Sequence, residues 1–247
     1  MPLGYPVANF SPADSDPCFC GSGRRFGDCC GARTGRRGPP AGIRVFQRFV
    51  EPDLCRKWVE RLERRPRKRA RILDPEQSSP GAPVYVEDPS RVCDDVNPGV
   101  LRKAINDTIT RGFQHVASSM GESLAWYEVP RILRYEAGGR YLRHADSCQY
   151  EPATRTWYRV EDRDLSLLLY LNEDYTGGGL TFTHFHCHFR PRTGDLLVFP
   201  SDNRYEHQAE PVESGVRYAV ASWAFFRSSR RVRERAPNGA IPFRSSS

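Results

Sequence analysis

RYLRHADS, residues 140–147, carries a histidine and an aspartate two positions apart, His144 and Asp146. Side chains alternate between the two faces of a β-strand, so this pair is expected to project to one side and to bind one metal ion. A second imidazole comes from His207 in SDNRYEHQAEP, residues 201–211, which we expect on a later strand. Folding would therefore bring two imidazoles and one carboxylate to one face of a metal ion and leave its opposite face open.

This ligand set is diagnostic of non-haem iron(II) oxygenases. Ten residues after His207, Arg217 lies in GVRYAVASWAFF, residues 215–226, an alternating apolar strand that would direct one cation into the same cavity. A buried arginine needs an anion, so we expect an anion to bind there. Trp223 follows six residues later on the same face and is expected to line the pocket. A His-x-Asp triplet alone is common by chance; the order of the ligands and the arginine in one β-rich segment carries the prediction.

Short apolar runs dominate the chain from residue 131 onward, and turns that contain Gly or Pro separate them. Examples are RILRY (131–135), LSLLLYLN (165–172) and DLLVFP (195–200). This pattern predicts a mainly β-fold with flanking helices, an antiparallel double-stranded β-helix or jelly roll with helices on one face. A chain of 247 residues can bury one such core and still carry a small N-terminal module.

Two helices are expected ahead of this sheet, one starting at Pro52 and one at Asn97–Pro98. Each has an apolar stripe at helical spacing, formed by Leu54, Trp58 and Leu62 in the first helix and by Leu101, Ile105, Ile109 and Val116 in the second. Residues 74–98 are expected to be loop, with one short strand at PVYVE. Residues 147–164 are too polar for the core and are expected to form a loop over the open face of the metal.

Four of the eight cysteines fall within PCFCGSGRRFGDCCGA, residues 17–32. Cys18, Cys20, Cys29 and Cys30 form two close pairs around a Gly-Ser-Gly turn, which lets the four thiolates close on one tetrahedral zinc ion. Such clustering in a cytosolic protein indicates metal binding more than disulfides. A knot of two disulfides is the alternative, although the adjacent Cys29 and Cys30 would pair awkwardly.

This segment resembles the SEC-C motif found at the C-terminus of the SecA translocation ATPase, including GSGRR and an aromatic residue before the second cysteine pair. The resemblance implies a module that docks to protein or ribosomal partners and performs no chemistry, since a zinc ion held by four protein ligands has no open position. After it, residues 33–42 are rich in Gly, Pro and Arg and are expected to be a linker.

Three later stretches resemble the Fe(II)/2-oxoglutarate-dependent dioxygenases of the prolyl hydroxylase branch, and they are similar to both prolyl 3-hydroxylases and prolyl 4-hydroxylases. They are RYEAGGRYLRHADS (134–147), LSLLLYLNEDYTGGGLTF (165–182) and GDLLVFPSDNRYEHQAEPVESGVRYAVASW (194–223). We therefore expect a SEC-C-like module at residues 1–32 and a dioxygenase domain at residues 43–247.

The resemblance implies a role for each candidate site residue. His144, Asp146 and His207 would hold Fe(II), to which 2-oxoglutarate binds through its 2-oxo group and C1 carboxylate. Arg217 would hold the distal carboxylate, because a planar guanidinium matches a carboxylate with two hydrogen bonds. Tyr170 and Tyr135 fall where prolyl hydroxylases place tyrosines that contact the cosubstrate; an ordinary place at the edge of the core is the alternative for both.

The activity that the resemblance implies is hydroxylation of an aliphatic carbon, with a prolyl residue in a protein as the favoured substrate. Fe(II), 2-oxoglutarate and dioxygen would be required, succinate and carbon dioxide would be released, and ascorbate is a further cofactor that the family allows. One alternative is a hydroxylase of a free amino acid or peptide metabolite. The other is an inactive dioxygenase fold that serves as an adaptor or sensor, against which the intact triad and Arg217 argue.

The net charge of +7 is carried almost wholly by arginine, with clusters at residues 61–71 and 227–235. These clusters favour nucleic acid, ribosomes or acidic partners, and a solvated basic surface is an equal alternative. No apolar run is long enough to span a membrane, and the N-terminus lacks the features of a secretory signal, so we expect a cytoplasmic protein.

THFHCHF, residues 183–189, places three histidines at alternating positions and offers an alternative second metal site, although a solvent-facing strand or loop is the simpler explanation. The four cysteines outside the N-terminal cluster are scattered and are expected to remain thiols. The two metal sites are expected to be separable: His207→Ala should remove activity and keep zinc, and Cys20→Ser should do the reverse.

Overall fold

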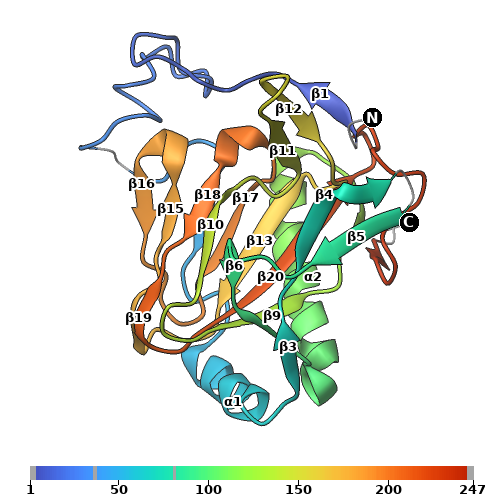
Figure 1. Ribbon diagram of the computed structural model, residues 1–247. Coiled ribbons are helices and arrows are strands. Elements are labelled where there is room, and N and C mark those ends of the chain that lie inside the picture. Colours follow the sequence, from blue (N-terminus) through green and yellow to red (C-terminus); the bar gives the residue numbers. More distant parts are fainter. Residues whose placement is uncertain (1–3, 36–37, 80–81, 244–247) are drawn as a thin grey trace.

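Two facing β-sheets with two helices on the outer side of the larger one make up the computed structural model, which describes residues 4–35, 38–79 and 82–243 (Figure 1). The strand order in the larger sheet is β2-β17-β13-β20-β9-β7-β3, with β8 and β21 joined to the far end of β20. The order in the smaller sheet is β16-β15-β18-β10-β6. All pairings between the described strands are antiparallel, and the predicted jelly roll is confirmed.

The strands of the larger sheet are β2 Arg44–Phe46, β3 Arg67–Arg69, β7 Asp94–Val96, β8 Leu124–Tyr127, β9 Arg131–Tyr135, β13 Leu165–Tyr170, β17 Leu196–Pro200, β20 Arg217–Phe226 and β21 Ile241–Pro242. Those of the smaller sheet are β6 Arg91–Val92, β10 Arg140–His144, β15 Leu180–Phe182, β16 Cys187–Phe189 and β18 His207–Ala209.

The central strands of the larger sheet are buried on both faces, which explains their almost continuous apolar sequence. In β13, Leu165, Leu167 and Leu169 join the core beneath the helices. The alternate residues of β13 face the opposite way, and Leu168 and Tyr170 line a cavity between the two sheets. One strand therefore serves the hydrophobic core with one face and the candidate site with the other.

Both helices cover the outer face of the larger sheet. The first, α1 Pro52–Leu62, begins with proline at a first-turn position, as predicted. The second, α2 Arg102–Met120, follows a 3-10 turn, η1 Gly99–Leu101, and ends at Gly121 in the left-handed conformation with φ of 69°. The predicted stripe of α1 is wrong in one residue: Leu54 is 43% exposed, and Cys55 takes its place in the core.

Phe113 of α2 is fully buried in this core and lies 5.8 Å from the ring of Tyr127. We expect Phe113→Ala to lower the free energy of unfolding by about 3–5 kcal/mol, since it removes a large buried ring and leaves a cavity. The control is Val100→Ala, because Val100 is 84% exposed and its truncation should change stability by less than about 0.5 kcal/mol. Equal losses in denaturant titrations of the two variants would show that α2 does not carry the core.

The short strand expected at PVYVE is confirmed as β5, but the rest of the two predicted loops also contains strands, and there the sequence prediction is wrong. Residues 74–98 include most of the hairpin β4 Ile72–Ser79 and β5 Ala82–Val86, and also β6 and β7. Residues 147–164 include the hairpin β11 Cys148–Glu151 and β12 Thr156–Arg159. These segments are polar and bury little, so they lack the hydrophobic periodicity by which a strand is recognised, and backbone pairing holds them instead.

Shorter elements complete the fold: β1 Tyr5–Val7, β14 Tyr175–Gly177, β19 Val212–Gly215, η2 Thr183–Phe185 and η3 Asn203–Tyr205. The N-terminal strand β1 pairs with β12, so β1, β12 and β11 form a third, small sheet with the strand order β1-β12-β11. The boundaries proposed at residues 32 and 42 stay a prediction, and residues 36 and 37 of the expected linker lie outside the described residues. No helix of the described chain is long and apolar enough to cross a membrane.

Candidate active site

The three predicted metal ligands meet at one end of the cavity between the sheets. One potential ligand atom from each of His144, Asp146 and His207 lies within 4.8 Å of the others. The Nε2 atoms of His144 and His207 lie 3.6 and 3.7 Å from the two carboxylate oxygens of Asp146. Strand pairing sets this geometry, because His144 of β10 lies directly opposite His207 of β18. Asp146 follows in a bend just after β10, whereas the sequence predicted it on the strand itself.

Both imidazoles present a free Nε2 to the centre of this triad. The Nδ1 atom of His144 donates to the carbonyl of Leu142 at 2.8 Å, and that of His207 donates to the carbonyl of Tyr205 at 2.9 Å. A carbonyl can only accept, so each Nδ1 carries the proton and each Nε2 keeps its lone pair. Burial, together with nearby His144, lowers the pKa of His207 to about 4, which keeps its imidazole neutral and able to bind a metal.

The carboxylate of Asp146 is held ionised and in place. Burial by itself would raise its pKa, but the His207 and His144 imidazoles and the Arg163 guanidinium hold it well below the usual range. Its Oδ2 accepts a hydrogen bond of 2.6 Å from the hydroxyl of Ser166 on β13. The donor set fits a divalent metal, because two imidazoles and an oriented carboxylate offer ligand atoms that lie within 4.8 Å of one another.

Arg217 reaches the same cavity from β20. This cavity has a volume of about 40 Å³, and its walls include the triad and Arg217. The guanidinium is 2% exposed, stacks over the ring of Tyr135 at 4.0 Å and donates from Nη1 to the carbonyl of Gly178. Its Nε has no hydrogen-bond partner among the described residues. A buried arginine with an unused donor that faces a cavity fits an anionic ligand such as a carboxylate.

Tyr135, Tyr170 and Trp223 also line this cavity, as predicted. Burial raises the pKa of both Tyr135 and Tyr170, so their hydroxyls stay protonated and can donate to an oxygen atom in the cavity. The structure therefore brings all seven predicted residues of this cavity together. Direct contact of the tyrosines and Arg217 with a cosubstrate stays a prediction.

Two further residues of the cavity that carry polar groups, Tyr141 and Arg91, were not predicted. Tyr141 stacks on His144 with ring centroids 3.6 Å apart. Arg91 of β6 lies over the ring of Tyr141 at 4.7 Å, is 5% exposed, and has no hydrogen-bond partner for its Nε among the described residues. Arg91 gives no signal in the sequence, because it lies in a polar stretch that was expected to be loop.

A wide groove of about 440 Å³ opens beside the metal ligands. Its walls come from the hairpins β4–β5 and β11–β12 and from β10. Three large side chains that are at least one third exposed, Tyr85, Leu142 and Tyr150, line it, and the rings of Tyr150 and Trp157 lie 5.5 Å apart. The segment expected to cover the open metal face does border it, but as a paired hairpin.

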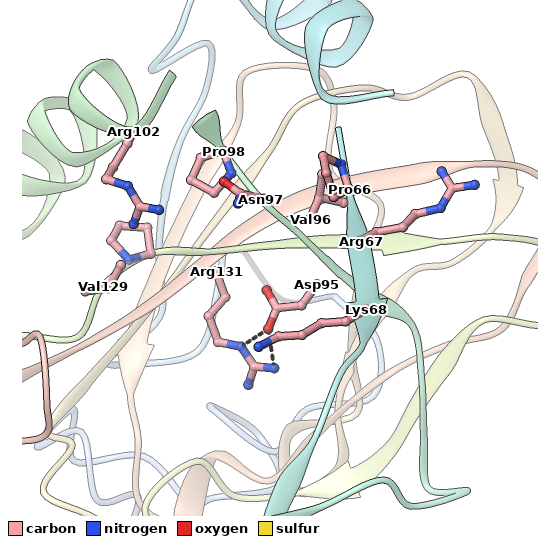
Figure 2. Close-up of a pocket in the computed structure, with 11 residues that line it drawn as sticks. Pro66, Arg67, Lys68, Asp95, Val96, Asn97, Pro98, Arg102, Val129 and Arg131 are labelled. Carbon is pink, nitrogen blue, oxygen red and sulfur yellow. Dashed lines mark hydrogen bonds and ion pairs between the residues drawn. The ribbon is translucent and has the colours of Figure 1, made fainter. Parts of the chain in front are cut away.

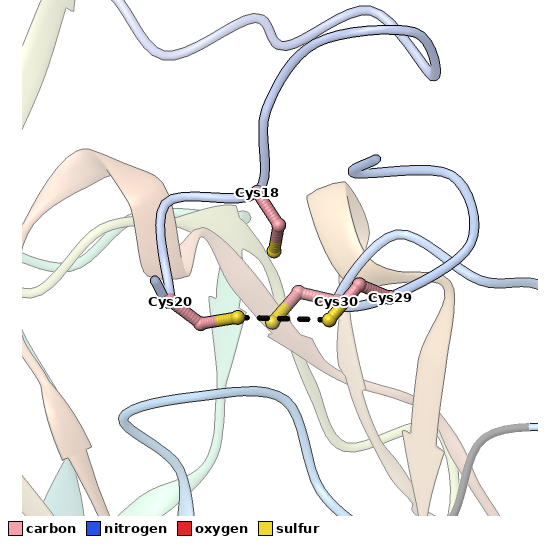
Figure 3. Close-up of side chains that lie close together, drawn as sticks. All are labelled: Cys18, Cys20, Cys29 and Cys30. Atoms are coloured by element: carbon pink, nitrogen blue, oxygen red, sulfur yellow. Dashed lines mark hydrogen bonds between the residues drawn. The ribbon is translucent and has the colours of Figure 1, made fainter. Parts of the chain in front are cut away.

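The four N-terminal cysteines also come together, as Figure 3 shows, and each offers a sulfur atom within 4.8 Å of the others. The Sγ atoms of Cys20 and Cys29 are 3.6 Å apart. The hydroxyl of Ser22 lowers the pKa of Cys20 to about 6 and also lowers that of Cys29, so these two sulfurs favour the thiolate form that binds metal. Four sulfur ligands in this arrangement fit structural zinc.

Another cavity of about 440 Å³ lies beside the edge strand β3 (Figure 2). Arg67, Lys68, Arg102 and Arg131 contribute positive charge to its walls, and Arg131 is paired with Asp95 at 2.7 Å. It contains part of the basic cluster at residues 61–71. Charged residues on an edge strand also prevent pairing with other chains, so this surface is explained without a ligand.

The histidines of THFHCHF do not share a strand face. His184 lies in η2, His186 has a left-handed backbone with φ of 45°, and His188 lies in β16. His184 pairs with Glu206 at 2.9 Å and His188 with Glu210 at 3.3 Å. The described residues therefore hold no three-histidine metal site in this segment.

A jelly roll with a two-histidine, one-carboxylate triad and a buried arginine in the same cavity is typical of the class of non-haem iron(II) oxygenases. Residues 130–225 match the model of the 2OG-Fe(II) oxygenase superfamily, and residues 15–32 match the SEC-C motif. The segment that carries the triad thus resembles the 2OG-Fe(II) oxygenases. The chain carries the domain of a 2-oxoglutarate-dependent dioxygenase, whose cofactors are Fe(II), 2-oxoglutarate and dioxygen.

Prolyl hydroxylases are among its curated relatives. The chain is 39% identical over 89 residues to prolyl 3-hydroxylase 3 of Mus musculus. This match covers 32% of this chain and 12% of that protein. It is 31% identical over 103 residues to a putative prolyl 4-hydroxylase of Acanthamoeba polyphaga mimivirus, covering 38% of this chain and 43% of that one. The similarity thus spans only a small part of the prolyl 3-hydroxylase and less than half of the viral protein.

Solved structures share the fold. A prolyl hydroxylase from Trichoplax adhaerens, in complex with a hypoxia inducible factor peptide, matches with a TM-score of 0.56 and 16% identity, covering 74% of this chain and 83% of that one. A viral collagen prolyl hydroxylase from Paramecium Bursaria Chlorella virus-1 matches with a TM-score of 0.51 and 16% identity, covering 74% and 95%. At this identity the likeness concerns the fold alone.

Proposed function

We propose that this protein hydroxylates an aliphatic carbon of a prolyl residue in a protein substrate and releases succinate and carbon dioxide. The observation that carries the proposal is the groove of about 440 Å³ that adjoins His144 and Asp146. It is far larger than the inner cavity of about 40 Å³, and exposed Tyr85 and Tyr150 lie along it. Exposed aromatic side chains around an open groove suit a polypeptide better than a small metabolite.

The residues of the triad and of the inner cavity have different roles in this reaction. Iron bound at the triad supplies the oxidising chemistry that consumes dioxygen and 2-oxoglutarate. Arg217 holds the distal carboxylate of 2-oxoglutarate, and the protonated hydroxyls of Tyr170 and Tyr135 donate to its oxygen atoms. Ser166 keeps the Asp146 carboxylate oriented at 2.6 Å, and Trp223 and Leu168 keep the inner cavity apolar and exclude water.

Prolyl hydroxylases among the relatives and a groove suited to polypeptide support this substrate class. A hydroxylase of a free amino acid or peptide metabolite is the second candidate, because the inner cavity alone suits a small molecule. An inactive adaptor is disfavoured, since the triad and Arg217 are complete. Cytoplasmic location and docking of the SEC-C segment to a ribosomal or protein partner also remain proposals; thiolates that bind zinc suit a reducing compartment.

The deciding experiment is to supply the purified protein with Fe(II) and 2-oxoglutarate, first alone and then with cell lysate. Succinate release that increases with lysate, together with a gain of one oxygen atom on a proline of a lysate protein, is the expected result. If the substrate is instead a small metabolite, succinate release should still increase after the lysate proteins are removed by filtration, and mass spectrometry should find no oxidised protein.

Trp157→Ala should separate the groove from the inner cavity. Trp157 lines the groove next to Tyr150 and does not line the inner cavity. Loss of a large aromatic contact with a polypeptide costs roughly 2 kcal/mol or more at an interface, so we expect protein hydroxylation to fall by about 30-fold. Succinate release without substrate should stay at the wild-type level, and a parallel fall in both measurements would contradict the assignment of the groove.

A further inference from the structure

The four-cysteine segment packs directly against the part of the jelly roll that carries His207. Phe26, Cys29 and Cys30 share one apolar cluster with Phe185 and Tyr205, and all five are buried. The ring of Phe185 lies 6.4 Å from that of Phe26 and 5.3 Å from that of Tyr205. The expected docking module is thus in contact with the oxygenase domain of its own chain.

The 3-10 turn η3, which immediately precedes the iron ligand, is anchored by this segment at two points. The side-chain amide of Asn203 donates to the carbonyl of Ala8 at 2.9 Å. The hydroxyl of Tyr205 donates to the carbonyl of Ala41 at 2.8 Å. Ala8 precedes the four cysteines in the chain and Ala41 follows them, so the two anchors flank the metal-binding segment.

A short chain of hydrogen bonds joins one sulfur atom to an iron ligand. The amide of Ala41 donates to Sγ of Cys30 at 3.4 Å, and the carbonyl of Ala41 accepts from the hydroxyl of Tyr205. The carbonyl of Tyr205 in turn accepts from Nδ1 of His207 at 2.9 Å. Gly42 permits this close approach: it has a φ of 87°, and a Cβ there would lie 2.1 Å from the hydroxyl oxygen of Tyr205.

We propose that the zinc-closed cysteine module positions His207 through Tyr205, so that zinc occupancy sets the affinity of the iron site. Without zinc the segment between the two anchors loses its cross-link, and η3 can open locally. The Tyr205 carbonyl then no longer fixes the ring orientation and tautomer of His207, and a ligand that must be ordered on binding holds metal more weakly. The proposal concerns metal binding and does not depend on which substrate is hydroxylated.

Manganese(II) tests the proposal, because a site of imidazoles and a carboxylate accepts it whereas a four-thiolate site prefers zinc. The full chain is loaded with zinc, its zinc content is measured, and Mn(II) is titrated while electron paramagnetic resonance reports the free ion. The variants are Cys20→Ser, which opens the zinc site, and Tyr205→Phe, which keeps the ring and removes only the hydroxyl bond. His207→Ala identifies the Mn(II) that binds at the triad.

Tyr127→Phe is the matched control. Tyr127 is also a buried tyrosine, and its hydroxyl lies 2.8 Å from that of Thr110, but it belongs to the helix-covered core. This variant should lose comparable stability in thermal unfolding and keep the Mn(II) dissociation constant. A change in Mn(II) affinity that appears in Tyr205→Phe and not in Tyr127→Phe therefore reports positioning of His207.

We expect the Mn(II) dissociation constant to rise by about 10-fold in both Cys20→Ser and Tyr205→Phe, the lower end of the effect of losing an outer-shell partner. The double variant should be no weaker than the single ones, because both changes break the same link. Wild-type Mn(II) affinity in Tyr205→Phe overturns the proposal even if Cys20→Ser fails to fold, and so does wild-type affinity in a folded, zinc-free Cys20→Ser. Mn(II) binding that His207→Ala leaves unchanged would overturn the iron site itself.

Discussion

His207→Ala is expected to lose iron and turnover together while the zinc content of the chain stays the same. Removing an outer-shell partner of a metal ligand costs about 10–100-fold in affinity or activity, so removing a ligand should cost roughly 100-fold or more. The four thiolates that hold zinc are untouched. Metal analysis of the purified variant and succinate release with added Fe(II) measure the two effects.

His188→Ala is the control for this change. Its imidazole is half exposed and lies 3.3 Å from the carboxylate of Glu210, away from the triad. Iron content and turnover should equal those of the wild type. Normal iron content in His207→Ala, or a similar loss in His188→Ala, would remove His207 from the iron site.

Arg217→Met is expected to raise the KM for 2-oxoglutarate with little change in zinc or iron content. Truncating one partner of a buried, hydrogen-bonded charge pair costs about 2–5 kcal/mol, which corresponds to a rise of about 30-fold or more. The KM of Arg217→Lys for 2-oxoglutarate should lie between those of the wild type and Arg217→Met, since lysine keeps the charge and loses the planar pair of donors. The measurement is succinate release at varied 2-oxoglutarate concentration without protein substrate.

Arg69→Met provides the matched comparison, because Arg69 pairs with Asp94 at 3.7 Å near the surface and does not line the cavity. It should leave the KM for 2-oxoglutarate unchanged. If Arg217→Met instead weakens only hydroxylation of protein and leaves the KM for 2-oxoglutarate at the wild-type value, Arg217 contacts the substrate and another residue must hold the cosubstrate.

The sequence was sufficient to predict the jelly roll and seven of the residues that line the inner cavity. Alternation along β20 places Arg217 and Trp223 on one face, and alternation along β13 directs Tyr170 to the same cavity. These are local rules of strand geometry, and they hold wherever both faces of a strand are buried. The spacing of the four N-terminal cysteines predicted their cluster in the same way.

Tyr141 escaped prediction because the register of β10 is irregular. It lies three positions before His144, and strict alternation would send the two side chains to opposite faces. A shift in register between these residues brings both into the cavity. Such bulges depend on pairing with a distant strand and leave no mark in the local sequence.

Contacts between distant segments escaped prediction for the same reason. Arg91 lies over Tyr141 because β6 pairs with β10. The hydrogen bond from Tyr205 to Ala41 joins residues 164 positions apart. The two metal sites, which the sequence predicted to be separable, therefore adjoin one apolar cluster. We accordingly expect Cys20→Ser to weaken metal binding at the triad as well as to remove zinc.

The pairing of β1 with β12 has a consequence for any attempt to divide this chain. Tyr5, Pro6 and Val7 lie opposite Arg159, Tyr158 and Trp157, so the first described strand supports the hairpin that borders the groove. A shortened protein that begins at residue 43 would leave that hairpin as a two-stranded ribbon, which is marginally stable in water. The strand β1 thus braces one of the hairpins that line the groove, and a protein cut at residue 43 should lose order there.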